Sequence, residues 1–456
     1  MLPNTKANGK GGATWVLIGA AAAILSACSL DDLLRVDAPD VLTTDELQGP
    51  GEISTQINGI IGAFNEQFDN YVLYSGLLTD EFLAAGTFPT RIEVDARRML
   101  ADNATLTDEV AEVMHRARLM ADTSVVNFTA AKDDPAFSDV IDLLDEGIVT
   151  GQFYGGYMRI LLAELYCETP IANGPVQSSD ALMEAGLALL QEAAAGAAAT
   201  GQEEIAAAAK IGQARALMWL GRYAEAAAIA DDTLIDAGFA FTADYSSNAP
   251  EQYNEVYTLT WGDGAALRWT VGAGNEAARH NERWPYFDEW VALGMIIDSA
   301  NVKRITVNPF SSAVDLTNAQ TKYPGYDADI PFATRAEADM ILAEFHVREG
   351  TYAAANAIVN GYRSAHGLPD IDFGNVAALR ASFEVPLPAS ADTDLKVRLA
   401  AMARERAREL WITGERQGTL RRYLQRDGLD LYPVTGEGTD ICFPIPQQEL
   451  DNNPSL

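Results

Sequence analysis

Apolar residues recur at helical spacing along most of the chain. From Glu52 onward they lie at steps of three and four, which places them on one face of a helix, and comparable patterns return further on. Ser179 and Asp180 have the chemistry of an N-cap for the run that follows them. The sequence therefore predicts an all-α protein. The first predicted helix carries Ile53, Ile57, Ile60, Ile61, Phe64 and Phe68, and others are expected over roughly 107–130, 136–147, 151–167, 179–198, 202–219 and 395–412.

Two helix boundaries repeat one another. The pattern Gly-x-Tyr-x-x-Ala begins at Gly221 and again at Gly350, each time between alanine-rich helical segments. It resembles the turn of a tetratricopeptide helix pair, in which the glycine ends one helix, the tyrosine packs into the angle and the alanine permits close approach. The roughly 34-residue period of a regular solenoid is absent. We therefore expect tetratricopeptide-like helix pairs rather than a full array.

The amino-acid composition changes between the two Gly-x-Tyr-x-x-Ala motifs. Residues 239–330 are irregular and rich in Gly, Asn, Asp, Pro and aromatic side chains. Within them, 256–261 and 267–271 alternate like strands around Gly262-Asp263-Gly264, which predicts a β-hairpin with an Asp-Gly turn. We expect an irregular, loop-rich insertion carrying a small β-hairpin. A second loop-rich stretch covers 368–394.

The N-terminus has the features of a targeting segment. Lys6 and Lys10 precede the apolar run 15–25, which is too short for the roughly 20 residues that span a bilayer. Leu25-Ser26-Ala27-Cys28 matches a bacterial lipobox, with an ordinary secretory signal and a chance cysteine as the alternative. We predict a lipoprotein signal peptide over 1–27, a lipidated tether over 28–51 and a single domain over 52–456. Several acyl chains on Cys28, such as palmitate, would give stable anchoring in a membrane.

The net charge bears on the possible binding partners, and the cysteines bear on a possible disulfide. The formal net charge is −33, and it becomes −35 when residues 1–27 and their two lysines are removed. Such a chain repels phosphate backbones, so no nucleic-acid partner is expected. An exported chain meets an oxidising compartment. Cys167 and Cys442 are then expected to form a disulfide, with two buried free thiols as the alternative.

The sequence offers little for catalysis. The four histidines are His115, His280, His346 and His366, and none belongs to an H-E-x-x-H motif. There is no G-x-S-x-G motif, no phosphate-binding glycine loop and no Cys/His metal spacing. We therefore expect no enzyme activity, no metal and no cofactor.

Aromatic residues concentrate in the insertion, with eight in the 38 residues from Tyr253 to Trp290, against 9% for the chain. Flat rings suit the C–H faces of pyranoses, and neighbouring polar groups can bond the hydroxyls. The alternative is that these rings form a small core of the insertion. Trp284 and Tyr286 are the first candidates for ligand contact because they flank Pro285, which favours a loop. The other candidates are Trp261, Trp269, Trp290, Asn281 and Arg283, and the fallback is a face near Tyr71, Tyr74 and Asp80.

Short motifs along the chain follow one family pattern: Thr79-Asp80-Glu81, Arg335-Ala336-Glu337 with Ile341-Leu342-Ala343-Glu344, Glu405-Arg406-Ala407-Arg408-Glu409-Leu410, Gly414-Glu415-Arg416, Leu420-Arg421-Arg422, and Pro444-Ile445-Pro446 with Glu449 and Asn453-Pro454. With these motifs and the lipobox, nearly the whole chain resembles the SusD/RagB family of surface lipoproteins, and the motifs after Glu405 are the most specific. Thr413 and Thr419 depart from the family pattern, which usually has Glu and Asp there. The resemblance implies a cell-surface, outer-membrane lipoprotein that captures nutrient, chiefly oligosaccharide, for a partner TonB-dependent β-barrel transporter. The rival hypotheses are a helical-repeat scaffold for peptide binding or envelope assembly and a lipid-anchored hydrolase.

Overall fold

The computed structural model describes residues 49–84, 88–261, 269–271, 294, 296–297, 303–306, 314–316, 319–383, 386–432 and 438–456. The chain divides into two units, Met1–Glu52 and Ile53–Leu456. The predicted signal peptide and the lipidation site Cys28 lie outside the described residues, as does all of the tether before Gly49. In the part of the chain that the structure describes, no helix has both the length and the apolar character needed to cross a membrane.

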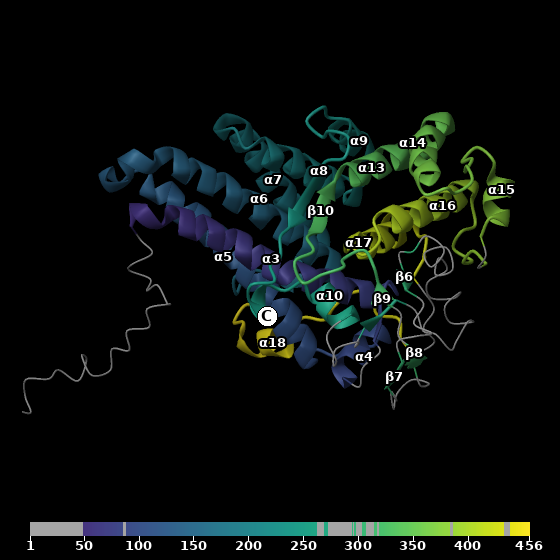
Figure 1. The fold of residues 1–456 in the computed structure, drawn as a ribbon, viewed down its shortest axis with the longest axis horizontal. Helices are drawn as coiled ribbons and strands as arrows, with labels where there is room; N and C mark the ends of the chain where they lie inside the picture. The colour runs from purple at the N-terminus through teal and green to yellow at the C-terminus, as the bar shows by residue number, and fades with distance from the viewer. Residues whose placement is uncertain are drawn as a thin grey trace, which may run out of the picture. The chain divides into compact units, whose positions relative to one another are not determined.

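Long helices dominate the first half of the unit 53–456, as the hydrophobic pattern predicts. The 26-residue helix α3 packs against α5 and α6, while α7 packs against both α6 and α8 (Figure 1). The buried residues of α3 include Ile60, Phe64 and Phe68 at helical spacing. Ser178, one residue before the predicted cap, accepts a hydrogen bond from the backbone N–H of Ala181 and begins α7. These helices are α3 (Ile53–Leu78), α5 (Glu112–Ala131), α6 (Ile141–Leu165), α7 (Ser179–Thr200) and α8 (Glu203–Trp219).

Helix α6 is continuous where the sequence predicted two helices, at 136–147 and 151–167. Gly151 does not interrupt it, because this glycine lies against α5: a Cβ added there would be 2.6 Å from a methyl group of Val125. The glycine therefore serves close helix packing rather than a helix end. Residues Pro135–Val140 form a separate 3₁₀ turn in front of α6.

Both predicted tetratricopeptide-like pairs are present. Gly221 and Gly350 adopt left-handed φ values of 76° and 75°, and each separates two helices. Helix α9 also packs against α13, so the two pairs are adjacent although the insertion separates them in sequence. The Arg348 guanidinium lies 3.9 Å from the ring centroid of Tyr223, between the two pairs. The pairs are α8 with α9 (Tyr223–Ala230), and α13 (Arg335–Arg348) with α14 (Tyr352–Ala365).

The insertion begins and ends at one antiparallel ladder, in which β4 (Ala240–Ala243) pairs with β10 (Ile330–Thr334). The predicted hairpin is wrong. Glu255–Thr260 forms helix α10 instead of a strand, because the Asn254 side chain accepts a hydrogen bond from the Tyr257 N–H and caps it. Trp269–Thr270 is a strand, β5, but it pairs with β1 (Leu83–Ala84) far away in sequence. The predicted turn at 262–264 lies outside the described residues.

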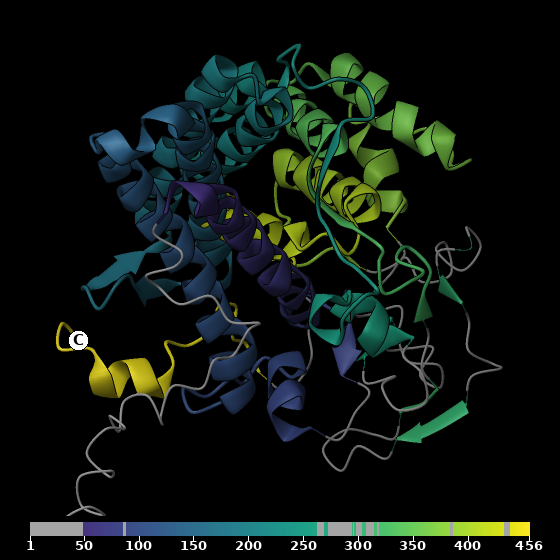
Figure 2. The same ribbon diagram turned by 60° about the vertical axis from the view of Figure 1, so that its left-hand side comes forward.

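The C-terminal segment returns to the N-terminal helices. In Figure 2, α16 and α17 appear in yellow-green and yellow; α16 packs against α13, whereas α17 packs against α3 and α6. Fold class is thus as predicted, helical with a few short strands. The remaining elements are η2 (Pro50–Glu52), α4 (Pro89–Asp95), η3 (Leu106–Ala111), β2 (Glu168–Pro170), β3 (Val176–Ser178), η5 (Pro250–Gln252), β6 (Ile296–Ile297), β7 (Lys303–Thr306), β8 (Val314–Leu316), β9 (Ala319–Gln320), α15 (Val376–Ala381), α16 (Asp394–Glu409), α17 (Glu415–Arg422), η6 (Tyr423–Asp427) and α18 (Gln447–Asn452).

Candidate ligand-binding site

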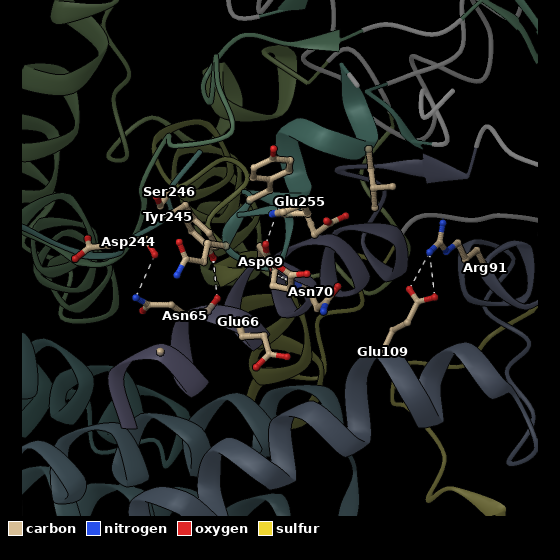
Figure 3. A pocket seen from close by; sticks show the side chains of 16 residues that line it. Asn65, Glu66, Asp69, Asn70, Arg91, Glu109, Asp244, Tyr245, Ser246 and Glu255 are labelled. Carbon is tan, nitrogen blue, oxygen red and sulfur yellow. Dashed lines mark hydrogen bonds and ion pairs between the residues drawn. The ribbon is translucent and has the colours of Figure 1, made fainter. Parts of the chain in front are cut away.

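A cavity of about 540 Å³ opens between α3 and the first part of the insertion (Figure 3). This volume lies within the range of small-ligand sites, roughly 300–1,000 Å³. Figure 3 shows Arg91 and Glu109 at one end, Asp244 and Ser246 at the other, and Asp69 between them. The lining residues are Gly62, Asn65, Glu66, Asp69, Asn70, Arg91, Glu109, Asp244, Tyr245, Ser246, Pro250, Glu251, Gln252, Tyr253, Glu255 and Leu259.

Helix α3 supplies one wall of the cavity. Asn65 and Asp69 are four residues apart, so they project from the same face of the helix. Asp69 is only 2% exposed, and its two carboxylate oxygens accept hydrogen bonds from the backbone N–H groups of Asn70 (2.7 Å) and Glu255 (2.8 Å). Burial raises the pKa of Asp69 well above its usual range. Asp69 therefore fixes the start of α10 against α3.

The opposite wall is the loop that follows β4. Its Tyr245 hydroxyl donates to the backbone oxygen of Asn65 (3.1 Å), and the Asn65 side-chain amide donates back to the oxygen of Asp244 (3.2 Å). The backbone N–H of Tyr245 donates to Asp329 (3.0 Å), near the other end of the insertion. The loop is thereby tied to both α3 and β10.

An ion pair closes the far end of the cavity. Arg91 on α4 donates to both carboxylate oxygens of Glu109, at 3.0 and 2.9 Å, and also to the Tyr74 hydroxyl at 3.2 Å. The Tyr74 hydroxyl in turn donates to Glu109. Both hydrogen bonds to Glu109 come from one guanidinium nitrogen, Nη2, and the pairing of opposite charges leaves little net charge at that end.

Four half-buried rings run from the edge of the cavity along α10, and we call them the aromatic strip: Tyr253, Tyr326, Tyr257 and Trp261. Successive ring centroids are 4.3 Å (Tyr253–Tyr326), 4.9 Å (Tyr326–Tyr257) and 6.4 Å (Tyr257–Trp261) apart. The Trp261 indole N–H donates to the backbone oxygen of Gln320. Tyr326 was missed by the sequence reasoning because it lies 36 residues beyond the predicted cluster; its neighbours Pro324 and Gly325, typical of an exposed turn, were the available signal.

The candidate residues separate into three groups. Trp261 is half-buried and belongs to the strip. Trp269 is fully buried, edge-on to Tyr74 (5.2 Å) and Phe82 (6.0 Å), so it is a core residue and its ring cannot meet a ligand. Asp80 is also buried. The fallback face fails for the same reason, since the rings of Tyr71 and Tyr74 are fully buried, and Trp284, Tyr286, Trp290, Asn281 and Arg283 lie outside the described residues.

The predicted disulfide is present. Cys167 and Cys442 are bonded across 275 residues, with their Cα atoms 5.4 Å apart. Next to the bond, the N–H of Phe443 donates to the oxygen of Leu165 (2.9 Å). The tail is thereby held at the end of α6.

The motifs that carry the family resemblance form a buried ion network. Arg215 on α8 donates to Glu164 on α6 (2.8 and 2.5 Å) and to Glu415 on α17 (2.8 Å). Arg421 donates to three carbonyl oxygens at the end of α6, at 2.6 to 3.0 Å, those of Ala163, Glu164 and Tyr166. These contacts hold α17 against the helices that support the cavity.

The two departures from the family pattern are accommodated within the same helices. The Thr419 hydroxyl accepts a hydrogen bond from Arg406 (3.3 Å), and the Thr413 hydroxyl donates to the backbone oxygen of Leu410 (2.6 Å). Both threonines are buried. A short hydroxyl thus fills each position where the family usually has a carboxylate.

Among the described residues, no group of three or more His, Cys, Asp or Glu side chains is placed to hold a metal ion. Of the histidines, burial lowers the pKa of His115 to about 4, and His366 lies 3.2 Å from Glu409. His280 falls outside the described residues.

Neither a family model nor a curated protein sequence matches the chain. Its structure is similar to a SusD superfamily protein from Bacteroides thetaiotaomicron, with a TM-score of 0.61, 14% identity and coverage of 89% of this chain and 98% of that one. It is also similar to surface glycan-binding protein A from Bacteroides uniformis (TM-score 0.60, 12% identity, 88% and 98% covered). A third neighbour is surface glycan-binding protein A from Bacteroides thetaiotaomicron in complex with laminarihexaose (TM-score 0.58, 13% identity, 89% and 98% covered). Nearly the whole length of these proteins is matched, and the chain has the fold of the SusD superfamily.

Proposed function

We propose that the protein is a non-enzymatic surface lipoprotein of the SusD type that binds oligosaccharide and delivers it to a TonB-dependent outer-membrane transporter. The observation that carries the proposal is the aromatic strip at the edge of a polar cavity. One part of each half-buried ring packs against the protein, and the other part is exposed and can contact a ligand. Stacking on the C–H faces of sugar rings supplies affinity, and the polar cavity supplies orientation.

The similar structures support a glycan as the ligand class. Two of them are named surface glycan-binding protein A, and one of those is in complex with laminarihexaose. The lipobox ending at Cys28 supports anchoring to a membrane. The transporter partner rests on the family resemblance of the motifs in the second half of the chain. Co-purification of a large β-barrel with the intact lipoprotein in mild detergent tests that part of the proposal.

A calorimetric screen of purified protein against neutral oligosaccharides tests the binding proposal. Tyr326→Ala and Trp261→Ala should weaken binding of the best oligosaccharide by about 1–3 kcal/mol each, because each removes a stacking face. Tyr352→Ala is the matched control, since this half-buried tyrosine packs against Arg398 away from the strip.

Two outcomes contradict the proposal. One is binding that is unchanged in both strip variants. The other is chemical conversion of the oligosaccharide, which would favour the lipid-anchored hydrolase. Chromatography of the recovered oligosaccharide detects such turnover.

A further inference from the structure

The cavity next to the aromatic strip is dominated by acids. Among the described residues that line it, Arg91 is the one base, and its Nη2 donates to both carboxylate oxygens of Glu109, so the two charges offset each other. Glu66 at the rim forms an ion pair with Arg116 (2.5 Å). Four further acids line the cavity, Asp69, Asp244, Glu251 and Glu255, and of these Asp244 and Glu251 are exposed.

These acids are spread along the cavity rather than gathered at one point. Asp244 and Glu251 lie on the loop between β4 and α10 and are exposed, whereas Asp69 lies on α3 at the floor. They do not belong to any cluster of described side chains suited to a metal ion. A cavity of about 540 Å³ also has room for a sugar-sized group rather than a bare ion. The distribution suits an organic ligand whose positive charges are themselves spread out.

The remaining polar and aromatic groups agree with a cationic ligand. Tyr253 belongs both to the cavity lining and to the aromatic strip, and the face of a tyrosine ring attracts an ammonium group. The side-chain oxygen of Asn65 is buried without a hydrogen-bond partner among the described residues, so it is a further acceptor in the lining. An ammonium group carries three donors and no acceptor, which matches such a surface.

We propose that the ligand is a glycan bearing protonated amines, whose rings stack on the aromatic strip and whose ammonium groups lie against the exposed carboxylates of Asp244 and Glu251. The inference rests on the proposed function and names the substrate class of the same site. A neutral glycan uses the strip and can donate hydroxyl hydrogen bonds to Asp244 or Glu251, but it forms no ion pair with them. An acidic glycan is repelled by them and by a chain whose formal net charge is −33.

A matched pair of ligands tests the inference. The probes are a β-1,4-linked glucosamine hexamer with free amines and the same hexamer with every amine acetylated, compared by calorimetry at mildly acidic pH. Rings and linkage are identical, and the two probes differ in the charge and in the acetyl groups, so the salt dependence of the difference isolates the charge. The amine form should bind about tenfold more tightly, and the difference should shrink as salt is added. Equal or weaker binding of the amine form overturns the inference.

Paired variants locate the effect. Glu251→Gln and Asp244→Asn should each lower the affinity for the amine hexamer by several-fold and leave the affinity for the acetylated hexamer unchanged. Glu349→Gln, an exposed glutamate between α13 and α14, should change neither. An identical response to both hexamers in the cavity variants also overturns the inference. If neutral oligosaccharides bind and Tyr326→Ala weakens them while amines give no advantage, the proposed function stands and this inference fails; if no oligosaccharide binds, both fail.

Discussion

The guanidinium of Arg422 on α17 donates to both carboxylate oxygens of Glu344 on α13, each at 2.6 Å. Glu344 has no exposed surface. Burial alone raises the pKa of this carboxyl, but the charges of Arg422 and Arg348 outweigh burial and hold the pKa well below its usual range. A motif residue of the tail thus keeps a fully buried carboxylate charged inside the second helix pair.

The first prediction follows from that pair. Arg422→Met leaves the Glu344 carboxylate buried with one partner fewer, and it should lower the free energy of unfolding by about 3–5 kcal/mol. Urea denaturation followed by circular dichroism measures it. Arg222→Met is the control, because Arg222 forms its ion pair with Glu225 at the surface and its loss should leave the midpoint in place. Equal midpoints for wild type and Arg422→Met would show that the pair does not stabilise the fold.

A second prediction concerns pH. Burial raises the pKa of Glu81 from its ordinary 4.5 to about 7. The folded state then holds this proton more tightly than the unfolded state. The contribution of Glu81 to stability is complete below pH 4.5 and is lost as the pH rises to about 7, by roughly 3 kcal/mol. Glu81→Gln should remove that part of the pH dependence. Parallel stability curves for the two proteins between these pH values would contradict the assignment.

The third prediction concerns the disulfide. Replacing Cys167 and Cys442 together with serine should lower stability by about 2–5 kcal/mol, because the bond restricts a long loop of the unfolded chain. Alkylation without reduction, followed by mass spectrometry, should label neither cysteine in the wild-type protein. Two labelled thiols would show that the bond is absent from the mature chain.

The fourth prediction separates a core ring from a ligand ring. Trp269→Ala should lower the free energy of unfolding by about 3–5 kcal/mol, because the ring is fully buried against Tyr74 and Phe82. Trp284→Ala should instead lower the affinity for oligosaccharide with little change in melting temperature, because Trp284 is the first candidate for ligand contact. Thermal unfolding and calorimetry on both variants decide between the roles. A stability loss in Trp284→Ala as large as in Trp269→Ala would place both rings in a core.

The fifth prediction tests the anchor. Cys28→Ala should leave the protein unprocessed or release it into the soluble fraction, because lipidation requires the thiol. Fractionation of cells that express wild type and variant, with intact mass of the product, measures this. Normal cleavage and normal sedimentation of the variant with membranes would refute the lipoprotein assignment.

Periodic patterns predicted the fold well because they are local. The faces of α3 and α7, the left-handed glycines at 221 and 350 and the bounds of the insertion all depend on neighbouring residues. The hairpin failed because 256–261 does resemble a strand, yet Asn254 caps a helix there and Asp69, 186 residues earlier, holds its first N–H. A contact of that span leaves no trace in a short window of sequence.

The site was predicted only in part for the same reason. Trp261 and Tyr253 were found by aromatic density, but their partner Tyr326 joins them through the return of the chain at β10. The acids of the cavity come from α3 and from the loop after β4, so no motif groups them. The density of aromatic residues also made Trp269 a candidate, because the sequence does not distinguish a buried ring from an exposed one.

The ties between the two ends of the chain bear on how the protein is made. Tyr71 donates to the oxygen of Gly414 across 343 residues, and the N–H of Ile412 donates to Glu81 across 331. Contacts of such sequence separation form slowly, because a long loop must close before they stabilise anything. The N-terminal helix α3 therefore cannot reach its final packing while the chain is still growing. Helix α3 can pack against α5 and α6 early, but its contacts with Ile412 and Gly414 must wait until that segment has been made.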